Sequence, residues 1–341
     1  MDKKIAVLGV GGIGSSIGAD LTKAGHNVML VDQWPAHVEA MKVRGLHVVM
    51  PKEEFQIPVQ ALHHCDLCSL KQQFDIVFLA AKSYDTRWMV ELIKPYLKSD
   101  GVLVSTQNSL NDEWITPIIS KERDVACAFE LSAEVFEPGL VKRNIGRKAA
   151  RFVLGELDGG MTPRVQELAH ILSAVGRTEV STNIWGAKWT KLVFNTMNSA
   201  LGAIGGFRAS ARIGDSRYVG FCIKLGREAV QVAAALGRIL EPVFGLTPEG
   251  FINSTDETLK GLLMKINTDV SPEARSHVLQ DFLKGRRTEI DYINGLIVER
   301  GREVNVPTPF NEIITSLVRQ IEQGKVEPSP STLEKLLDQC M

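Results

Sequence analysis

Residues 4–32, "KIAVLGVGGIGSSIGADLTKAGHNVMLVD", decide the fold of this chain. An apolar run at 4–9 closes on glycine, which is typical of a buried parallel strand. Ile13, Ile17 and Leu21 then recur at helical spacing, and a second apolar run follows at 28–31. The order strand, glycine-rich turn, helix and strand predicts the start of a doubly wound α/β domain.

The turn carries the pattern G-x-G-x-x-G. This pattern is specific where it follows a strand and opens a helix, as it does here. The first glycine permits a tight turn, the second lets a pyrophosphate approach the backbone, and the third lets helix and strand pack closely. The start of the helix offers free N–H groups and partial positive charge to phosphates. We therefore expect a dinucleotide at Gly9, Gly11, Gly12, Ile13 and Gly14; the alternative is a glycine-rich turn without a ligand.

Asp32 ends the second strand, where the adenosine ribose would lie. A carboxylate there accepts hydrogen bonds from both ribose hydroxyls of NAD and repels the 2′-phosphate of NADP. Gln33 follows, and no Arg or Lys stands within the next nine residues. We therefore favour NAD over NADP; the alternative is that Asp32 is only a turn or helix-capping residue.

The pattern of strands and helices changes near residue 184. Before it, buried strands are expected at 74–82 and 101–108, and the runs "LHVVM" and "FQIPVQAL" between 46 and 70 resemble two strands of a hairpin. After it, long helical patterns dominate, including 187–205 and 288–304. We expect a Rossmann-type doubly wound parallel sheet over 1–183 and an all-helical domain over 184–341, with a short final helix.

The composition excludes several classes of protein. The 341 residues are 44% hydrophobic with a net charge of −1, and no block of like charges suggests nucleic acid as a partner. No apolar run reaches the roughly 18–20 residues of a membrane span. Five irregularly spaced cysteines favour a reducing compartment, and no signal peptide precedes the first strand, so we expect a cytoplasmic protein.

The segment "HHCDLC", residues 63–68, has the spacing of half a zinc site. A closed site needs four ligands, and no second Cys-x-x-Cys follows. A metal site and a redox dithiol are the alternatives, but we expect a polar loop and no metal.

A polar stripe runs through "KWTKLVFNTMNSALGAIGG", residues 188–206. Helical spacing brings to one face Lys191, Asn195, Asn198, Ser199 and Gly202. The other faces are apolar, and buried amides and an ammonium are costly unless a partner satisfies them. A ligand rich in oxygen would do so; the alternative is an ordinary solvated face.

Lys191 is the best candidate for a general acid, because hydride reduction of a ketone leaves an alkoxide that needs a proton. No histidine competes: His277 is the only one in the helical domain, and we place His26, His37 and His47 at surface turns.

Lys82 and Asn108 end two strands, at the edge of the sheet where such folds bind ligands. Lys82 could meet a carboxylate or the nicotinamide ribose, and Asn108 could hydrogen-bond the substrate or the cofactor. The alternative for both is plain turn chemistry.

Five stretches between about residues 3 and 320 together resemble the ketopantoate reductase family. They are "AVLGVGGIGS", "FDIVFLAAKSYDT", "STQNSLND", "WTKLVFN" and "LQDFLKGRRTEIDYINGLIVERG". The resemblance implies a Rossmann domain joined to a helical domain, with NADPH and a 2-oxo acid in the cleft between. It implies that Lys191 is the general acid, that Asn195 contacts the substrate, and that Glu289 binds substrate hydroxyls or orients Lys191.

The chain departs from the family at several contact positions. Ser199 stands where the family has asparagine, with Asn198 one place earlier, and His277 stands where it has serine, with Ser276 beside it. Those four residues are our candidates for substrate contact. Ala274 replaces an upstream asparagine, "SLN" replaces Gly-x-Gly after Asn108, and Gln33 replaces an arginine in keeping with the family's NADPH use.

Three functions follow as hypotheses. The first is NAD(H)-dependent interconversion of a 2-oxo acid or related ketone and its alcohol. The second is authentic NADPH-dependent 2-dehydropantoate 2-reduction for pantothenate synthesis. The third is a dinucleotide-sensing protein without chemistry. We expect a small-molecule substrate in the first two cases, and a homodimer is an open expectation.

Overall fold

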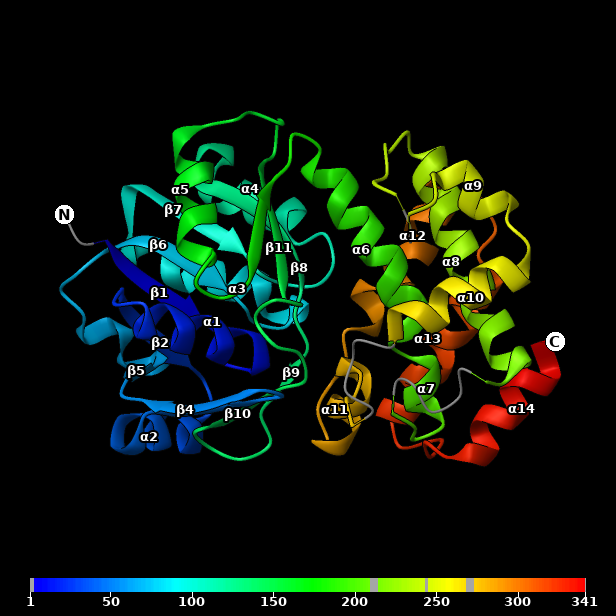
Figure 1. Cartoon of the computed structure of the whole chain (residues 1–341), viewed down its shortest axis with the longest axis horizontal. Coiled ribbons are helices and arrows are strands. Elements are labelled where there is room, and N and C mark those ends of the chain that lie inside the picture. Colours follow the sequence, from blue (N-terminus) through cyan, green and yellow to red (C-terminus); the bar gives the residue numbers. More distant parts are fainter. Residues whose placement is uncertain (1–2, 209–213, 243–244, 268–272, 341) are drawn as a thin grey trace. The chain divides into compact units, whose positions relative to one another are not determined.

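The computed structural model describes residues 3–208, 214–242, 245–267 and 273–340 (Figure 1). The chain divides into two compact units, Met1–Ile184 and Trp185–Met341. That the first part binds the dinucleotide and the second the substrate stays a prediction. No helix in the described ranges combines the length and apolarity needed to cross a membrane.

The first unit is built on an eight-stranded sheet with the order β12-β11-β8-β7-β6-β1-β2-β5. Six of these strands run parallel, whereas β11 pairs antiparallel with β8 and carries β12 parallel to itself. The strands are β1 Lys4–Leu8, β2 Asn27–Asp32, β5 Gln60–His63, β6 Phe74–Leu79, β7 Leu97–Ser105, β8 Asp124–Glu130, β11 Arg151–Glu156 and β12 Arg177–Val180.

Both faces of this sheet are buried. On β1, Ile5 and Val7 belong to one hydrophobic core, and Ala6 and Leu8 belong to another. The helices of the unit are α1 Gly12–Lys23, α2 Pro35–Arg44, α3 Thr86–Ile93, α4 Asp112–Ile119 and α5 Pro163–Leu172. The first core includes residues of α1 and α5 and the second includes residues of α3 and α4, so the predicted doubly wound α/β class is confirmed.

A smaller sheet has the order β4-β3-β10-β9. Its strands are β3 Leu46–Met50, β4 Glu53–Ile57, β9 Ala133–Glu134 and β10 Leu140–Arg143. The predicted hairpin is present as β3 and β4, but the run "FQIPVQAL" is not one strand. It breaks at Pro58 into β4 and β5, which belong to different sheets, because proline has no N–H to donate to a ladder.

The second unit is helical in its described parts. Its helices are α6 Ile184–Asn198, α7 Leu201–Ile204, α8 Ser216–Ala235, α9 Pro248–Asn253, α10 Asp256–Asn267, α11 His277–Leu283, α12 Asn294–Glu303, α13 Pro309–Glu322 and α14 Pro330–Cys340. The helix expected over 187–205 is interrupted at residues 199–200, just after Asn198, whose side-chain amide donates to the Phe194 carbonyl. The helix expected over 288–304 begins only at Asn294, after a short 3₁₀ turn at Ile290–Tyr292.

Candidate active site

The glycine loop between β1 and α1 is shaped by the chain's contacts with itself. Gly9 has φ +89°, and a Cβ placed on it would lie 2.7 Å from the Ala81 nitrogen. A Cβ on Gly14 would collide with the Gly9 carbonyl oxygen, and one on Gly12 would lie 2.5 Å from the Ala133 oxygen. Gly11 differs from these, because its Cβ would have no atom within 4 Å. The second glycine of the motif therefore borders open space at the start of α1.

Hydrogen bonds hold this loop in place from several sides. The N–H of Gly9 donates to the Val31 oxygen at 2.9 Å, and the Ser15 hydroxyl donates to the Val10 oxygen at 2.9 Å. His37 Nδ1 accepts from the Gly139 N–H at 2.9 Å, which leaves Nε2 to donate toward Ser15 Oγ at 3.4 Å. The prediction of surface turns is wrong for two of the three histidines. His37 is fully buried on α2 and supports the loop, and His47 lies in strand β3. Nothing in the residues next to His37 in the sequence indicated that it would support the glycine loop.

Asp32 is tied to the same loop. Its carboxylate accepts from the Val10 N–H at 2.5 Å and from the Trp34 N–H at 2.8 Å. The second bond closes a turn two residues long, so Asp32 has the turn role that was the alternative to ribose binding, and ribose binding stays a prediction. Its side chain lies at the carboxyl end of β2, and Gln33 follows it in the sequence.

The ends of β6 and β7 are joined by side-chain amides and hydroxyls. Asn111 donates to the Asn108 carbonyl at 2.6 Å and to Ser83 Oγ at 3.2 Å, and Ser83 Oγ in turn donates to that carbonyl at 3.3 Å. Ser109 has φ +74°, a left-handed conformation in which glycine, the residue of the family pattern, is free of strain. β6 and β7 end three residues before Lys82 and Asn108, so these half-buried residues follow the strands at this edge and do not end them as expected.

In the second unit, α6 carries Lys191 and Asn195 one turn apart. Asn195 is buried, whereas Lys191 is half-buried and its Nζ lies 4.8 Å from the centre of the Phe194 ring. Lys188, one turn before Lys191, is only 3% exposed. Sequence reasoning did not select it, although two lysines three residues apart on one apolar helix were a visible signal.

Glu289 and His277 come together from segments separated in sequence. His277 Nδ1 lies 3.9 Å from Glu289 Oε2, and the Glu289 side chain is 4% exposed. Glu289 is therefore a buried acid and not a solvated one.

The remaining substrate candidates differ in what their side chains do. Ser276 caps α11 by accepting from the Leu279 N–H at 3.2 Å, and the Asn198 amide is bonded within its own helix at Phe194. Ser199 is buried just past the end of α6. Two of the four candidates for substrate contact, Ser276 and Asn198, are therefore already hydrogen-bonded to their own helices.

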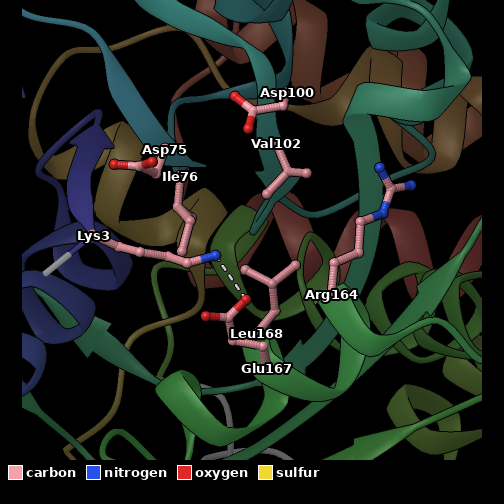
Figure 2. A pocket seen from close by; sticks show the side chains of 8 residues that line it. All are labelled: Lys3, Asp75, Ile76, Asp100, Val102, Arg164, Glu167 and Leu168. Carbon is pink, nitrogen blue, oxygen red and sulfur yellow. Dashed lines mark hydrogen bonds and ion pairs between the residues drawn. The ribbon is translucent and has the colours of Figure 1, made fainter. Parts of the chain in front are cut away.

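A hollow in the first unit lies away from the glycine loop. Figure 2 shows Lys3 reaching toward Glu167, with Nζ 2.7 Å from the carboxylate. The hollow is lined by Lys3, Asp75, Ile76, Asp100, Val102, Arg164, Glu167 and Leu168. Lys3 and Asp75 stand at the amino ends of β1 and β6, the edge of the sheet opposite the glycine loop. This hollow therefore has no part in the candidate site.

Two family models match the chain. The model of ketopantoate reductase PanE/ApbA matches residues 5–159, and the model of the ketopantoate reductase C-terminal part matches residues 183–322. The chain belongs to the ketopantoate reductase family.

Similar proteins include both named ketopantoate reductases and a related dehydrogenase. The 2-dehydropantoate 2-reductase of Pyrococcus horikoshii is 28% identical over 321 residues, which are 94% of this chain and 97% of the relative. A ketopantoate reductase structure from Ralstonia eutropha is 29% identical with a TM-score of 0.78, covering 94% of this chain and 99% of that one. The structure of D-mandelate dehydrogenase with NADH and anilino(oxo)acetate is 25% identical with a TM-score of 0.80, at the same coverage.

Membership of the ketopantoate reductase family confirms the predicted oxidoreductase class and the Rossmann-type fold of the first unit. Such enzymes use a nicotinamide dinucleotide, and the glycine loop of this chain fits one. A Rossmann site offers a pyrophosphate open space at the second glycine and the start of a helix, and this chain has both at Gly11 and α1. Such a site offers the ribose a carboxylate, and here a carboxylate ends β2.

Proposed function

We propose that this ketopantoate reductase family member reduces a 2-oxo acid to its 2-hydroxy acid with NADH. The observation that carries the proposal is the glycine loop, held by Asp32 and open at Gly11. The chain also carries Asn195 and Glu289, both of which are buried. The bound dinucleotide would supply the hydride.

The cofactor would be held by the first unit. Gly11, Gly12, Ile13 and Gly14 would present backbone N–H groups to the pyrophosphate. Gly9, whose own N–H donates to the Val31 oxygen, would shape the turn beneath it. Lys82 and Asn108 would contact the nicotinamide end from the carboxyl edge of β6 and β7, and Asp32 would bind the adenosine ribose.

The proton would come from the second unit. Lys191 would donate from Nζ to the carbonyl oxygen as charge develops there. Asn195 would hydrogen-bond the substrate, and Glu289 would orient Lys191 or accept from a substrate hydroxyl. Ser199 and His277 would contact the substrate side chain, with smaller roles for Asn198 and Ser276 because their side chains are already bonded locally.

NAD is the favoured cofactor because a carboxylate ends β2 and an uncharged glutamine follows it. A 2′-phosphate near Asp32 would meet like charge without a compensating Arg or Lys in the following turn. The D-mandelate dehydrogenase structure with NADH gives this choice a precedent in the same fold.

A second candidate is NADPH-dependent reduction of 2-dehydropantoate, the activity named for the Pyrococcus horikoshii relative. The alignment with that relative covers nearly the whole length of both chains, which favours this candidate. The altered positions at Gln33, Ser199, Ala274 and His277 argue for a different cofactor and a different substrate side chain.

Initial rates with NADH and with NADPH distinguish these candidates. The substrates are 2-dehydropantoate and a panel of 2-oxo acids with branched or aromatic side chains, followed by absorbance of the reduced cofactor. We expect kcat/KM with NADH to exceed that with NADPH at least 10-fold. A preference for NADPH with 2-dehydropantoate would overturn the NADH proposal, and tight NADH binding without turnover on any ketone would favour a sensor.

A further inference from the structure

The turn after β5 gathers three side chains that bind metals. One ligand atom from each of His63, His64 and Cys65 lies within 4.8 Å of the other two. His63 ends β5, and a 3₁₀ helix, His64–Ser69, follows it. From the sequence we expected a loop without a metal here, because a closed site needs four ligands and no second Cys-x-x-Cys follows.

His63 has the hydrogen bonding of a metal ligand. Its Nε2 lies 3.0 Å from the Gln33 backbone oxygen, to which it can donate. Ligand histidines usually donate their second ring N–H to a carbonyl or carboxylate in this way, which directs the other nitrogen to the metal. Nδ1 is that other nitrogen, and its contact with the Cys65 N–H is long, at 3.3 Å.

His64 supplies a second, independent observation. Its Nδ1 is inaccessible to solvent and has no hydrogen-bond partner among the described residues. Its ring makes edge contacts with His63 at 4.8 Å and with Trp88 at 5.5 Å, which limit its movement.

The two cysteines complete the set. Cys65 and Cys68 are exposed free thiols three residues apart, and side chains at that spacing in a 3₁₀ helix lie on one face. Cys68 Sγ donates to the Cys65 carbonyl oxygen at 3.3 Å, which places this thiol beside the residue that supplies the third ligand.

We propose that His63, His64 and Cys65 bind one Zn²⁺ ion, with Cys68 as the fourth ligand. Two imidazoles and two thiolates are a common tetrahedral zinc set, with bonds of about 2.0–2.3 Å. Ligand atoms in such a site lie roughly 3.3–3.8 Å apart, so the present cluster would contract by about 1 Å. The ion would hold the turn after β5 beside Gln33, because His63 is bonded to the Gln33 carbonyl.

The test is a zinc titration of the reduced full-length protein in competition with a chromogenic chelator. We expect one equivalent of Zn²⁺ bound with a Kd below about 1 μM at pH 7, and Co²⁺ should give tetrahedral d–d absorption with a thiolate charge-transfer band. C65S and H64Q should each weaken Zn²⁺ binding at least 100-fold, and C68S about 10-fold or more.

Matched controls separate this site from general thiol and imidazole affinity. Cys340→Ser removes another accessible cysteine, and His47→Gln removes an exposed histidine that is paired with Glu54 at 2.7 Å. Both variants should bind zinc like the wild type, and circular dichroism would verify the fold of each variant. Fewer than about 0.2 equivalents of zinc, or unchanged affinity in C65S and H64Q, would overturn the site; unchanged affinity in C68S alone would overturn its role as the fourth ligand.

Discussion

Among single residues, Lys191 offers a test of the proposed proton transfer that leaves the fold intact. Replacing it with methionine keeps the aliphatic stem and its packing near Phe194 but removes the proton donor. We expect kcat to fall by about 10²–10⁴-fold, with cofactor affinity nearly unchanged. Single-turnover kinetics with NADH would measure this loss.

Lys335→Met is the matched control for that change. Lys335 is an exposed lysine on α14, and its loss should leave kcat within twofold of the wild type. If Lys191→Met retained most of its single-turnover rate, Lys191 would not be the general acid.

Gly11 allows cofactor binding to be tested without disturbing the loop. An alanine there meets no protein atom within 4 Å, and its backbone, at φ −73° and ψ −160°, suits any residue. We expect Gly11→Ala to keep the free energy of unfolding within about 0.5 kcal/mol and to weaken NADH binding at least 100-fold, because the methyl group would take the place of the pyrophosphate. Calorimetric titration with NADH measures the affinity.

Two further alanine variants serve as controls for Gly11→Ala. Gly146→Ala also meets open space and should bind NADH normally. Gly14→Ala collides with the Gly9 carbonyl and should lose stability as well as binding. Normal NADH affinity in Gly11→Ala would place the pyrophosphate elsewhere.

At the scale of elements, Glu156 fastens the end of β11 to the start of α5. Its carboxylate accepts from Arg164 at 2.8 and 2.5 Å and from the hydroxyl of Thr162, the residue that caps α5. Burial raises the pKa of Glu156, but the hydrogen bonds and the charge of Arg164 outweigh it and bring the pKa below the ordinary value of 4.5. The ionised form is therefore the one that the fold prefers.

Stability at this junction should depend on pH with a definite sign. Because the folded-state pKa is lowered, the contribution of Glu156 is fully present above about pH 5 and is lost as the pH falls through the folded-state value. We expect Glu156→Gln to cost about 2 kcal/mol at pH 7, and its difference from the wild type to shrink below pH 4.5. Urea unfolding at pH 7, 5 and 4 measures this.

Glu130→Gln provides the comparison for that series. Glu130 is an exposed acid 3.3 Å from Arg151, and its loss should cost under about 0.5 kcal/mol at each pH. A difference for Glu156→Gln that stayed constant from pH 7 to 4 would show that the carboxylate charge does not stabilise the junction.

For the whole molecule, the division into two compact units allows the cofactor to be located by measuring which unit it stabilises. NADH that binds only the folded chain at 100 times its Kd stabilises it by about 2.7 kcal/mol. Hydrogen exchange followed by mass spectrometry should show the largest protection by NADH in the peptides that span 9–15 and 31–34. Protection confined to peptides after residue 185 would contradict the assignment of the cofactor to the first unit.

The class of fold, the glycine loop and the family could all be predicted from the amino-acid sequence. These depend on local properties: the period of apolar residues selects strand or helix, and Gly9 needs a left-handed φ wherever its partner residues lie. Lys82 and Asn108 were placed at the ends of strands for the same reason. The pattern could not show the break after Asn198, because a side-chain bond to the preceding turn leaves the helical period of apolar residues unchanged.

Only the tertiary structure decided which polar groups are buried and what they meet. Arg143 on β10 is fully buried because it reaches Asp20 on α1 at 2.5 Å, a contact across 123 residues that no local pattern encodes. The burial of His37, the division of 53–63 between two sheets and the approach of His277 to Glu289 have the same origin. A buried charge is tolerated only where a distant partner compensates its lost hydration, so its position follows from the folded contacts rather than from its neighbours in the chain.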